Sequence, residues 1–297
     1  RRLGAGRRLA PGRALAPSVR KTRIRVRGFW SREAQTASAC AAAGRPRLGR
    51  VGRTYKTEAF VLRSFRYAEA DRVLHLYTHD RGRVGAIAKG IRKTTSRFGA
   101  RLEPFSHVEL LLHQGSGDLQ TVTGASLVDA HRPAREDPYR CSVGLVGAEA
   151  MLRLFVEEEK NERAFEALTR FFEAVDGVPA GAEGRAALDP LALAFQLKLL
   201  WLSGYVPHLE ACVECGGVEG LVGYLPRAGG AVCSTCAPTE TVILAPDGFR
   251  GVEALLRSPL ADAREVGLGE RAARDALAVV VAAYEFHGGF RLRTLTA

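Results

Sequence analysis

The stretch CVECGGVEGLVGYLPRAGGAVCSTC, residues 212–236, contains four of the chain's six cysteines. They form two C-x-x-C pairs separated by 17 residues, a spacing typical of zinc sites built from two such pairs. Two pairs that a hairpin brings together supply the four thiolates of a tetrahedral structural site. We therefore predict one structural Zn²⁺ per chain, with these ligands: Cys212, Cys215, Cys233 and Cys236.

Other cysteine chemistry fits this block less well. A disulfide framework suits a secreted chain, but no signal peptide is visible and Cys40 and Cys141 lie far from the block. A redox C-x-x-C is expected near a βαβ pattern, which is absent. The run HLEACVEC superficially resembles a zinc deaminase signature, but four thiolates fill the coordination sphere and leave no open catalytic position.

A second group of residues suits phosphate binding. The run AKGIRKTTSRFGARLEPF, residues 88–105, contains five basic side chains before its first acid, Glu103. Such a loop, with aromatic side chains nearby, is typical of barrels that bind single strands by phosphate contacts and base stacking. Tyr67, Tyr77 and Phe98 are candidate stacking residues, although a turn arginine is usually only solvated and Phe98 would also suit a core. The candidate nucleic-acid-binding residues are Arg66, Arg72, Arg81, Arg83, Lys89, Arg92, Lys93 and Arg97.

The net charge of +11 is unevenly distributed along the 297 residues. Residues 1–53 contain fourteen Arg and one Lys against one acid, residues 54–110 carry +5, and residues 111–297 carry −8. The first segment fits a nucleic-acid arm, an organellar transit peptide or upstream sequence translated in front of the true start. We expect residues 1–53 to be a disordered or wrongly included basic extension, outside the fold.

The elements that must position the basic residues have the pattern of strands. Runs over residues 55–67, 71–80 and 82–90 are rich in Val, Leu, Phe and Tyr and are separated by turn residues. Residues 107–113 alternate between apolar and polar, a hairpin turn is expected at residues 115–117, and residues 119–128 form the return strand. Five strands with a short helical insert near residues 95–101 predict a small OB-type barrel over residues 54–133.

After Pro138 the apolar period becomes helical. Leu145, Ala148, Leu152 and Phe155 recur at helical spacing, and a second series runs from Phe165 to Val175. Asp189 and Pro190 are a typical N-cap and first helical residue, and they open an apolar helix that should end at Gly204. Further helices are expected near residues 247–257 and 270–287. The predicted fold is thus α+β and multidomain, with a five-stranded OB-fold barrel followed by an α-helical domain (134–297) containing an inserted four-cysteine zinc ribbon at residues 210–238.

Several function classes lack support in the sequence. No Walker A, G-x-S-x-G or H-E-x-x-H motif is present, so ATP hydrolysis, serine-hydrolase and zinc-protease chemistry are not indicated. His75 and His79 have no third ligand nearby in the sequence. No run of about 18 apolar residues predicts a membrane span. We expect a protein without an enzymatic activity.

Several segments resemble the bacterial RecO DNA-repair proteins. These are TEAFVLRSFRYAEADRVLHLYTHDRGRVGAIAKGIRKTTSRFGARLEPF, then FQLKLLWLSGYVPHLEACVECGG, CSTC and YEFHGGFRLRTL, in the same order along residues 55–295. The resemblance implies an OB fold, a helical domain and an inserted zinc ribbon. It places DNA-contacting basic residues at Lys89, Arg92 and Lys93.

The resemblance also implies a function in recombinational repair. Family members bind single- and double-stranded DNA, anneal complementary strands coated with single-stranded DNA-binding protein, and work with RecR, in some bacteria with RecF, to load RecA. It implies a cytoplasmic, nucleoid-associated bacterial protein. Arg132, Arg135, Arg153 and Arg170 are candidates for binding the acidic tail of single-stranded DNA-binding protein. A zinc-ribbon and OB-fold RNA-binding or transcription factor, or a purely structural adaptor, are the alternatives.

Overall fold

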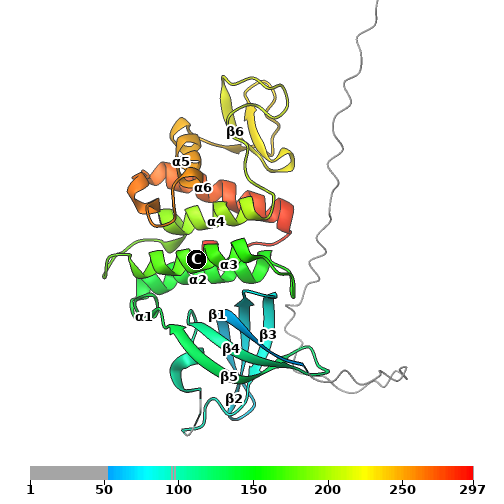
Figure 1. The fold of residues 1–297 in the computed structure, drawn as a ribbon. Helices are drawn as coiled ribbons and strands as arrows, with labels where there is room; N and C mark the ends of the chain where they lie inside the picture. The colour runs from blue at the N-terminus through cyan, green and yellow to red at the C-terminus, as the bar shows by residue number, and fades with distance from the viewer. Residues whose placement is uncertain (1–52, 95, 97, 297) are drawn as a thin grey trace, which may run out of the picture.

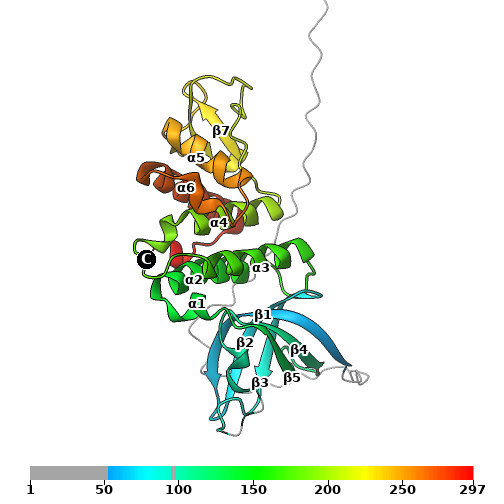
Figure 2. The ribbon, with the colours of Figure 1, turned by 60° about the vertical axis from the view of Figure 1, so that its left-hand side comes forward.

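The computed structural model describes residues 53–94, 96 and 98–296. They form a five-stranded barrel, a layered group of helices and a small ribbon that follow one another along the molecule (Figure 1). The rotated view in Figure 2 shows the same order, with the helices between the barrel and the ribbon. The predicted basic extension, apart from Arg53, lies outside the described residues.

The barrel closes in the order β1-β2-β3-β5-β4. Neighbouring strands are antiparallel except β3 and β5, which pair in parallel. The long β1 closes the barrel because its first half pairs with β4 and its second half with β2, and closure leaves no long strand edge unpaired. Its strands are β1 (Arg53–Tyr67), β2 (Asp71–Thr78), β3 (Gly82–Ala88), β4 (His107–Gln114) and β5 (Gln120–Asp129). The five predicted strands are therefore present.

Alternate side chains of the strands fill the barrel. Leu74 and Leu76 of β2 and Leu110 of β4 are fully buried, as the period of two requires. Phe98 and Leu102 belong to the same core, Leu102 at the end of a single helical turn, η1 (Gly99–Leu102). This turn lies slightly later than the helical insert predicted near residues 95–101, because its last residue packs into the barrel.

The helical part is built around one central helix, α4, most of whose side chains are buried. Asp189 caps its first turn by accepting the N–H of Leu191 at 2.9 Å, and Gly204 follows its end with φ +80°, as predicted. The helices are α1 (Arg132–Glu136), α2 (Pro138–Leu154), α3 (Glu162–Asp176), α4 (Pro190–Leu202), α5 (Pro246–Arg257), α6 (Glu270–Ala283) and α7 (Arg293–Thr296). The short helical turns are η2 (Ala186–Leu188), η3 (Pro226–Ala228), η4 (Ala263–Val266) and a π turn, η5 (Tyr284–Gly288).

The apolar face of α2 differs from the prediction. Leu145 is 45% exposed, whereas Val146, Gly147 and Met151 are buried. A Cβ on Gly147 would overlap the ring of Phe171, so this glycine allows α2 and α3 to approach closely. The helical periodicity of large apolar residues does not reveal a buried face that small residues form.

Aromatic rings join the barrel to the helices. Phe60 of β1 stacks on His107 of β4, with ring centroids 4.5 Å apart, and on Phe172 of α3 at 5.4 Å. Phe105 also contacts Phe172, at 5.0 Å. Phe60, Phe105 and Phe172 belong to the same hydrophobic cluster as α4, so the outer side of the barrel packs against the helices in a core separate from the barrel interior.

The ribbon extends from the helices at the end opposite the barrel (Figure 1). Its three strands are β6 (Leu221–Leu225), β7 (Gly230–Cys233) and β8 (Val242–Ile243), in the order β7-β6-β8. Leu225 and Val232 pack against Cys212 and Cys233 in a small core of their own. Among the described residues, no helix is long and apolar enough to cross a bilayer.

Candidate metal centre and nucleic-acid interface

The two cysteine pairs meet beside the β6–β7 hairpin. All four sulfur atoms lie within 4.8 Å of one another, and Sγ of Cys215 is 3.8 Å from Sγ of Cys233. A tetrahedral site with Zn–S bonds near 2.3 Å has sulfur–sulfur edges of about 3.8 Å. A disulfide would need about 2.05 Å, and the four cysteines are unbonded to one another. The geometry therefore fits a four-thiolate metal site.

Backbone hydrogen bonds hold both knuckles in shape. The N–H of Gly216 donates to the carbonyl of Cys212 at 2.7 Å, and the N–H of Cys236 donates to that of Cys233 at 3.1 Å. Gly216 has φ +75°, a left-handed conformation that favours glycine at this turn. The sequence between the pairs thus supplies the turn residues that bring the sulfur atoms together.

The electrostatics of the four thiols favour a cation. Hydrogen bonds from the backbone of Cys233 and Cys215 lower the pKa of the Cys212 thiol to about 6. Hydrogen bonds with the sulfur atoms of Cys233 and Cys215 raise the pKa of Cys236 to about 12. Four thiolates cannot share this space without a positive ion, and a bound divalent metal would deprotonate the remaining thiols. The cluster could therefore hold a metal ion.

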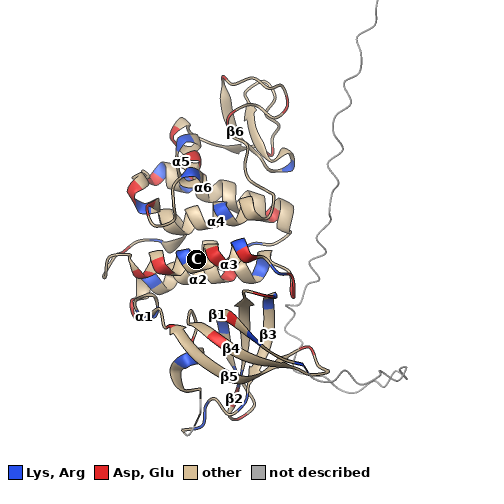
Figure 3. Cartoon of the chain, viewed as in Figure 1, with Lys and Arg blue, Asp and Glu red and all other residues tan. Residues whose placement is uncertain are grey.

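Three of the predicted basic residues lie together at one end of the barrel. Lys89, Arg92 and Lys93 are exposed in the loop after β3, which packs beside the β1–β2 turn. The N–H of Arg92 donates to the carbonyl of Ala70 at 3.0 Å, and its Nη1 donates to that of Glu69 at 2.8 Å. We call the β1–β2 turn with its flanking residues (66–72) and the loop 89–94 the basic end. Figure 3 shows the basic end at the end of the barrel farthest from the helices.

Arg66 and Arg72 flank the same turn as cross-strand partners. Nη1 of Arg72 donates to both carboxylate oxygens of Glu103, at 3.0 and 3.1 Å, so its charge is partly balanced. Arg66 is exposed and, within the described part of the chain, has no ion pair. Arg66, Lys89, Arg92 and Lys93 are therefore all presented to solvent at the basic end.

The structure separates Arg81 and Arg83 from this group. Arg81 donates to Oε1 of Gln114 at 3.0 Å and lies over the ring of Tyr55, 4.0 Å from its centroid. Arg83 binds Glu157 at 3.1 Å, toward the helices. Both lie at the β2–β3 turn, which a meander places at the opposite end from the β1–β2 turn, and this alternation could have separated them in the sequence. Arg97 lies outside the described residues.

Of the three aromatic residues predicted to stack on bases, only Tyr67 has an exposed ring. Tyr77 is fully buried and contacts Phe155, and Phe98 is only 2% exposed, so both are core residues. Tyr67 is 53% exposed at the end of β1. Phe65, which was not among the predicted stacking residues, is 39% exposed two residues earlier. Two residues apart on one strand, Phe65 and Tyr67 share a face, and this was the available signal.

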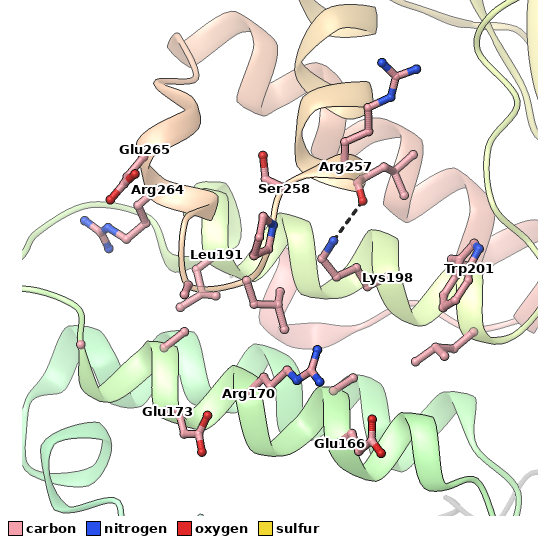
Figure 4. A pocket seen from close by; sticks show the side chains of 18 of the residues that line it. Glu166, Arg170, Glu173, Leu191, Lys198, Trp201, Arg257, Ser258, Arg264 and Glu265 are labelled. Carbon is pink, nitrogen blue, oxygen red and sulfur yellow. Dashed lines mark hydrogen bonds between the residues drawn. The ribbon is translucent and has the colours of Figure 1, made fainter.

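A separate pocket of about 1240 Å³ lies between α3, α4 and the segment after α5. Leu202, Leu256 and Leu260 form apolar walls, and Trp201 stands at one end (Figure 4). Arg170 of α3 points into the space between the helices, opposite Lys198 of α4. In the sequence the residues of this pocket extend from Arg163 to Glu265, so no local pattern indicates it.

Basic residues outnumber acidic ones in the lining of this pocket, but Arg257 is ion-paired with Glu253 and Arg264 with Asp189. Nζ of Lys198 donates to the carbonyls of Leu255 and Leu256, at 3.5 and 3.0 Å, and desolvation lowers its pKa. Arg170 is exposed and has no ion pair among the described residues. The charged lining residues are Arg163, Arg170, Lys198, Arg257 and Arg264, against Glu166, Glu173 and Glu265.

Comparison with known proteins covers both parts of the molecule. Residues 53–131 match the family described as Recombination protein O N terminal, and residues 135–296 match Recombination protein O C terminal. A DNA repair protein RecO from Rubrobacter xylanophilus is 40% identical over 216 residues, which are 70% of this chain and 83% of that protein. The DNA repair protein RecO from Nocardioides sp. is 39% identical over 206 residues, which are 68% of this chain and 82% of that protein. The DNA repair protein RecO from Frankia casuarinae is 37% identical over 244 residues, which are 81% of this chain and 96% of that protein.

The fold and these matches together define a DNA repair protein that functions in recombination. The chain belongs to the RecO family.

Proposed function

We propose that this protein is a non-catalytic recombination mediator. It binds single- and double-stranded DNA, anneals complementary strands coated with single-stranded DNA-binding protein, and helps RecR, in some bacteria with RecF, to load RecA. The observation that supports this most directly is the basic end, where four exposed cations, without carboxylate partners in the described part of the chain, gather on a closed barrel in a member of this family. It would act in the bacterial cytoplasm, at the nucleoid.

The barrel has the features of an OB fold. Its five strands close in the order β1-β2-β3-β5-β4, and OB barrels bind oligonucleotides through the β2–β3 face and the loops β1–β2 and β4–β5. The basic end includes the first of these loops. We assign residues 54–133 as the OB domain and residues 134–297 as the helical domain, with the zinc ribbon at 210–238.

The cysteine cluster is proposed to hold one structural Zn²⁺. Its four sulfur ligands leave no open coordination position, which fits a stabilising and not a catalytic metal. The ion would fix the ribbon, whose own hydrophobic core is small. The four cysteines all lie in the ribbon, so the metal is not part of the basic end.

The pocket between α3 and α4 suits the acidic tail of single-stranded DNA-binding protein. Of the four arginines suggested from the sequence, Arg170 lines this pocket, and Lys198 and Arg163 lie with it. Apolar walls beside cations fit a peptide that ends in apolar and acidic groups. Arg132, Arg135 and Arg153 do not line the pocket.

Annealing provides the test. Complementary DNA strands, each coated with cognate single-stranded DNA-binding protein, are mixed with the full chain, and pairing is followed by fluorescence. We expect rapid annealing by the wild type and strong loss in the variant Lys89→Ala, Arg92→Ala, Lys93→Ala. A matched variant, Arg227→Ala, Arg250→Ala, Arg274→Ala, removes the same charge from exposed positions away from the barrel and should anneal normally.

The outcomes separate the alternatives. Equal loss in both triple variants would mean that net charge, and not the basic end, governs annealing. Preference for RNA with no annealing would favour an RNA-binding or transcription factor. No nucleic-acid binding by the folded protein would favour a structural adaptor.

A further inference from the structure

Two exposed aromatic rings stand on the outer face of β1, next to the basic end. Phe65 and Tyr67 are 39% and 53% exposed, and both point away from the barrel core because Leu74, opposite Ser64, points inward. Phe65 lies against the ring of His75 on β2, with centroids 5.5 Å apart. We call these three rings the aromatic strip.

Phosphate-binding groups border this strip. Tyr67 pairs with Asp71, and Oδ1 of Asp71 accepts the N–H of Gly90 at 2.7 Å, so Tyr67 directly adjoins the loop that carries Lys89, Arg92 and Lys93. Arg66 lies between the two rings in the sequence and is exposed on the opposite face of the strand, so the loop cations are the ones nearest the rings. The acidic groups nearby are Glu69, Asp71 and Glu103, and Arg72 balances Glu103. Cations therefore predominate beside the exposed rings.

We propose that the aromatic strip stacks the unpaired bases of a single nucleic-acid strand whose phosphates are held by the basic end. This inference rests on the proposed function and extends it, because it assigns the preference for unpaired strands to Phe65 and Tyr67. Exposed aromatic faces bind bases irrespective of sequence, whereas bases stacked inside a duplex cannot reach them. The positive surroundings favour a polyanion over an apolar protein segment as the occupant.

His75 supports this surface as a neutral ring. Burial, with Arg63 and Arg83 nearby, lowers its pKa to about 4. The imidazole is therefore uncharged near neutral pH and offers Phe65 a neutral aromatic neighbour. The strip thus presents ring faces, and the cations around it supply the charge.

The test compares strands that differ only in their bases. Full-length protein is titrated with oligothymidylate, with an abasic strand of the same length and with duplex DNA, over a range of salt. We expect the wild type to bind oligothymidylate about ten-fold more tightly than the abasic strand, given the usual contribution of base stacking. The variant Phe65→Leu, Tyr67→Leu keeps apolar side chains but removes the ring faces, so it should bind both strands equally.

Three comparisons identify the cause of any change. The leucine variant should keep the wild-type salt slope, because its phosphate contacts remain, whereas Lys89→Ala, Arg92→Ala, Lys93→Ala should lower the slope with both strands. Phe65→Tyr, Tyr67→Phe retains the rings and should retain the preference for bases. Leu111→Ala removes an apolar side chain that is 41% exposed on β4, and it should bind as the wild type does.

Two results would overturn the inference. In the first, the wild type binds oligothymidylate and the abasic strand equally, or the leucine variant keeps the wild-type preference, while the triple lysine and arginine variant loses binding. The phosphate contacts then stand and the stacking assignment fails. In the second, the wild type binds none of the three DNA probes, and the proposed function fails together with the stacking assignment.

Discussion

Nδ1 of His131 lies 2.7 Å from Oδ2 of Asp176, and this contact joins the end of the barrel to the last turn of α3. The other carboxylate oxygen of Asp176 accepts the N–H of Ala134 at 2.9 Å, and Asp129 accepts the N–H of His131 at 2.8 Å. His131 is only 2% exposed and has φ 41°, a left-handed conformation rare for histidine. One carboxylate therefore fixes the direction in which the chain leaves β5 and enters the helices.

Asp176→Ala should weaken this junction. The change leaves the His131 ring and the N–H of Ala134 without their acceptor, and such buried groups cost about 1–3 kcal/mol each when unsatisfied. We expect a clear fall in the free energy of unfolding, measured with urea. Glu173→Ala, an exposed position on the same helix, is the control and should change little. Equal unfolding midpoints for the two variants would show that the contact does not stabilise the junction.

Arg83→Met should reduce stability and leave DNA binding intact. Arg83 is half-buried, donates to the carbonyl of Leu152 in the last turn of α2 and pairs with Glu157, so its loss removes a link from β3 to the end of α2 and the segment after it. We expect a loss of about 1–3 kcal/mol in the free energy of unfolding. DNA affinity and its salt slope should match the wild type.

Arg66→Met is the converse variant, because Arg66 is exposed at the basic end. It should lower the salt slope of DNA binding with little effect on unfolding. If Arg83→Met weakens DNA binding as much as Arg66→Met does, the two ends of the barrel act together and the assignment of Arg83 to the junction is incomplete.

Metal removal should unfold the ribbon first. Chelation removes the ion and Cys233→Ala removes one of its ligands, so either change leaves the ribbon with only its core of four buried residues. Zinc binding can contribute on the order of 10 kcal/mol to the folding of such a unit. We expect one zinc ion per chain by elemental analysis, lost in the variant, with faster proteolysis between β6 and β8. Cys141→Ala, which alters a thiol outside the cluster, should retain both metal and protease resistance. An unchanged melting temperature after metal loss would contradict a structural role.

Stability should fall on mild acidification, in part through His75. Its pKa is about 4 in the folded protein against an ordinary value of 6.5, chiefly because burial disfavours the charged ring. Above pH 6.5 neither state binds the proton. As the pH falls from 6.5 toward 4, the unfolded chain is protonated first, so the folded state loses relative stability.

The variant His75→Gln should show a weaker pH dependence. Urea unfolding near pH 7 and near pH 5 gives the change in free energy for each protein, and we expect the difference between the two conditions to be smaller in the variant. Burial also lowers the pKa of His107. This histidine is present in the wild type and in the variant, so it accounts for part of the pH dependence that remains. An identical dependence in the two proteins would mean that His75 does not titrate as its surroundings require.

Much of the fold depends on local rules and was predictable from the sequence. Strand alternation predicted five strands, and Asp189, Pro190 and Gly204 predicted the bounds of α4. The spacing of the four cysteines predicted their meeting, since turn residues within 25 positions can bring them together. Such features need only the chain's own dihedral preferences and neighbours close in sequence.

The buried face of α2 could not be predicted from such local rules. Leu145 has a helical spacing with Ala148 and Leu152, yet it is exposed, while Gly147 is buried against Phe171. Which side of a helix is buried depends on the shape of the helix packed against it. For α2 that neighbouring helix is α3, and its position against α2 is set only by the tertiary fold.

The amino-acid sequence alone predicts the helices and strands, the four-cysteine cluster and the group of basic residues around residues 89–93. The packing of the barrel on the helices sets how the outlying arginines are engaged, because it pairs Arg83 with Glu157 whereas Arg66 remains exposed. It also decided that Tyr77 is a core residue whereas Phe65 and Tyr67 face solvent. Alternation along a strand tells which residues share a face, but only the packing of barrel on helices tells which part of that face is covered.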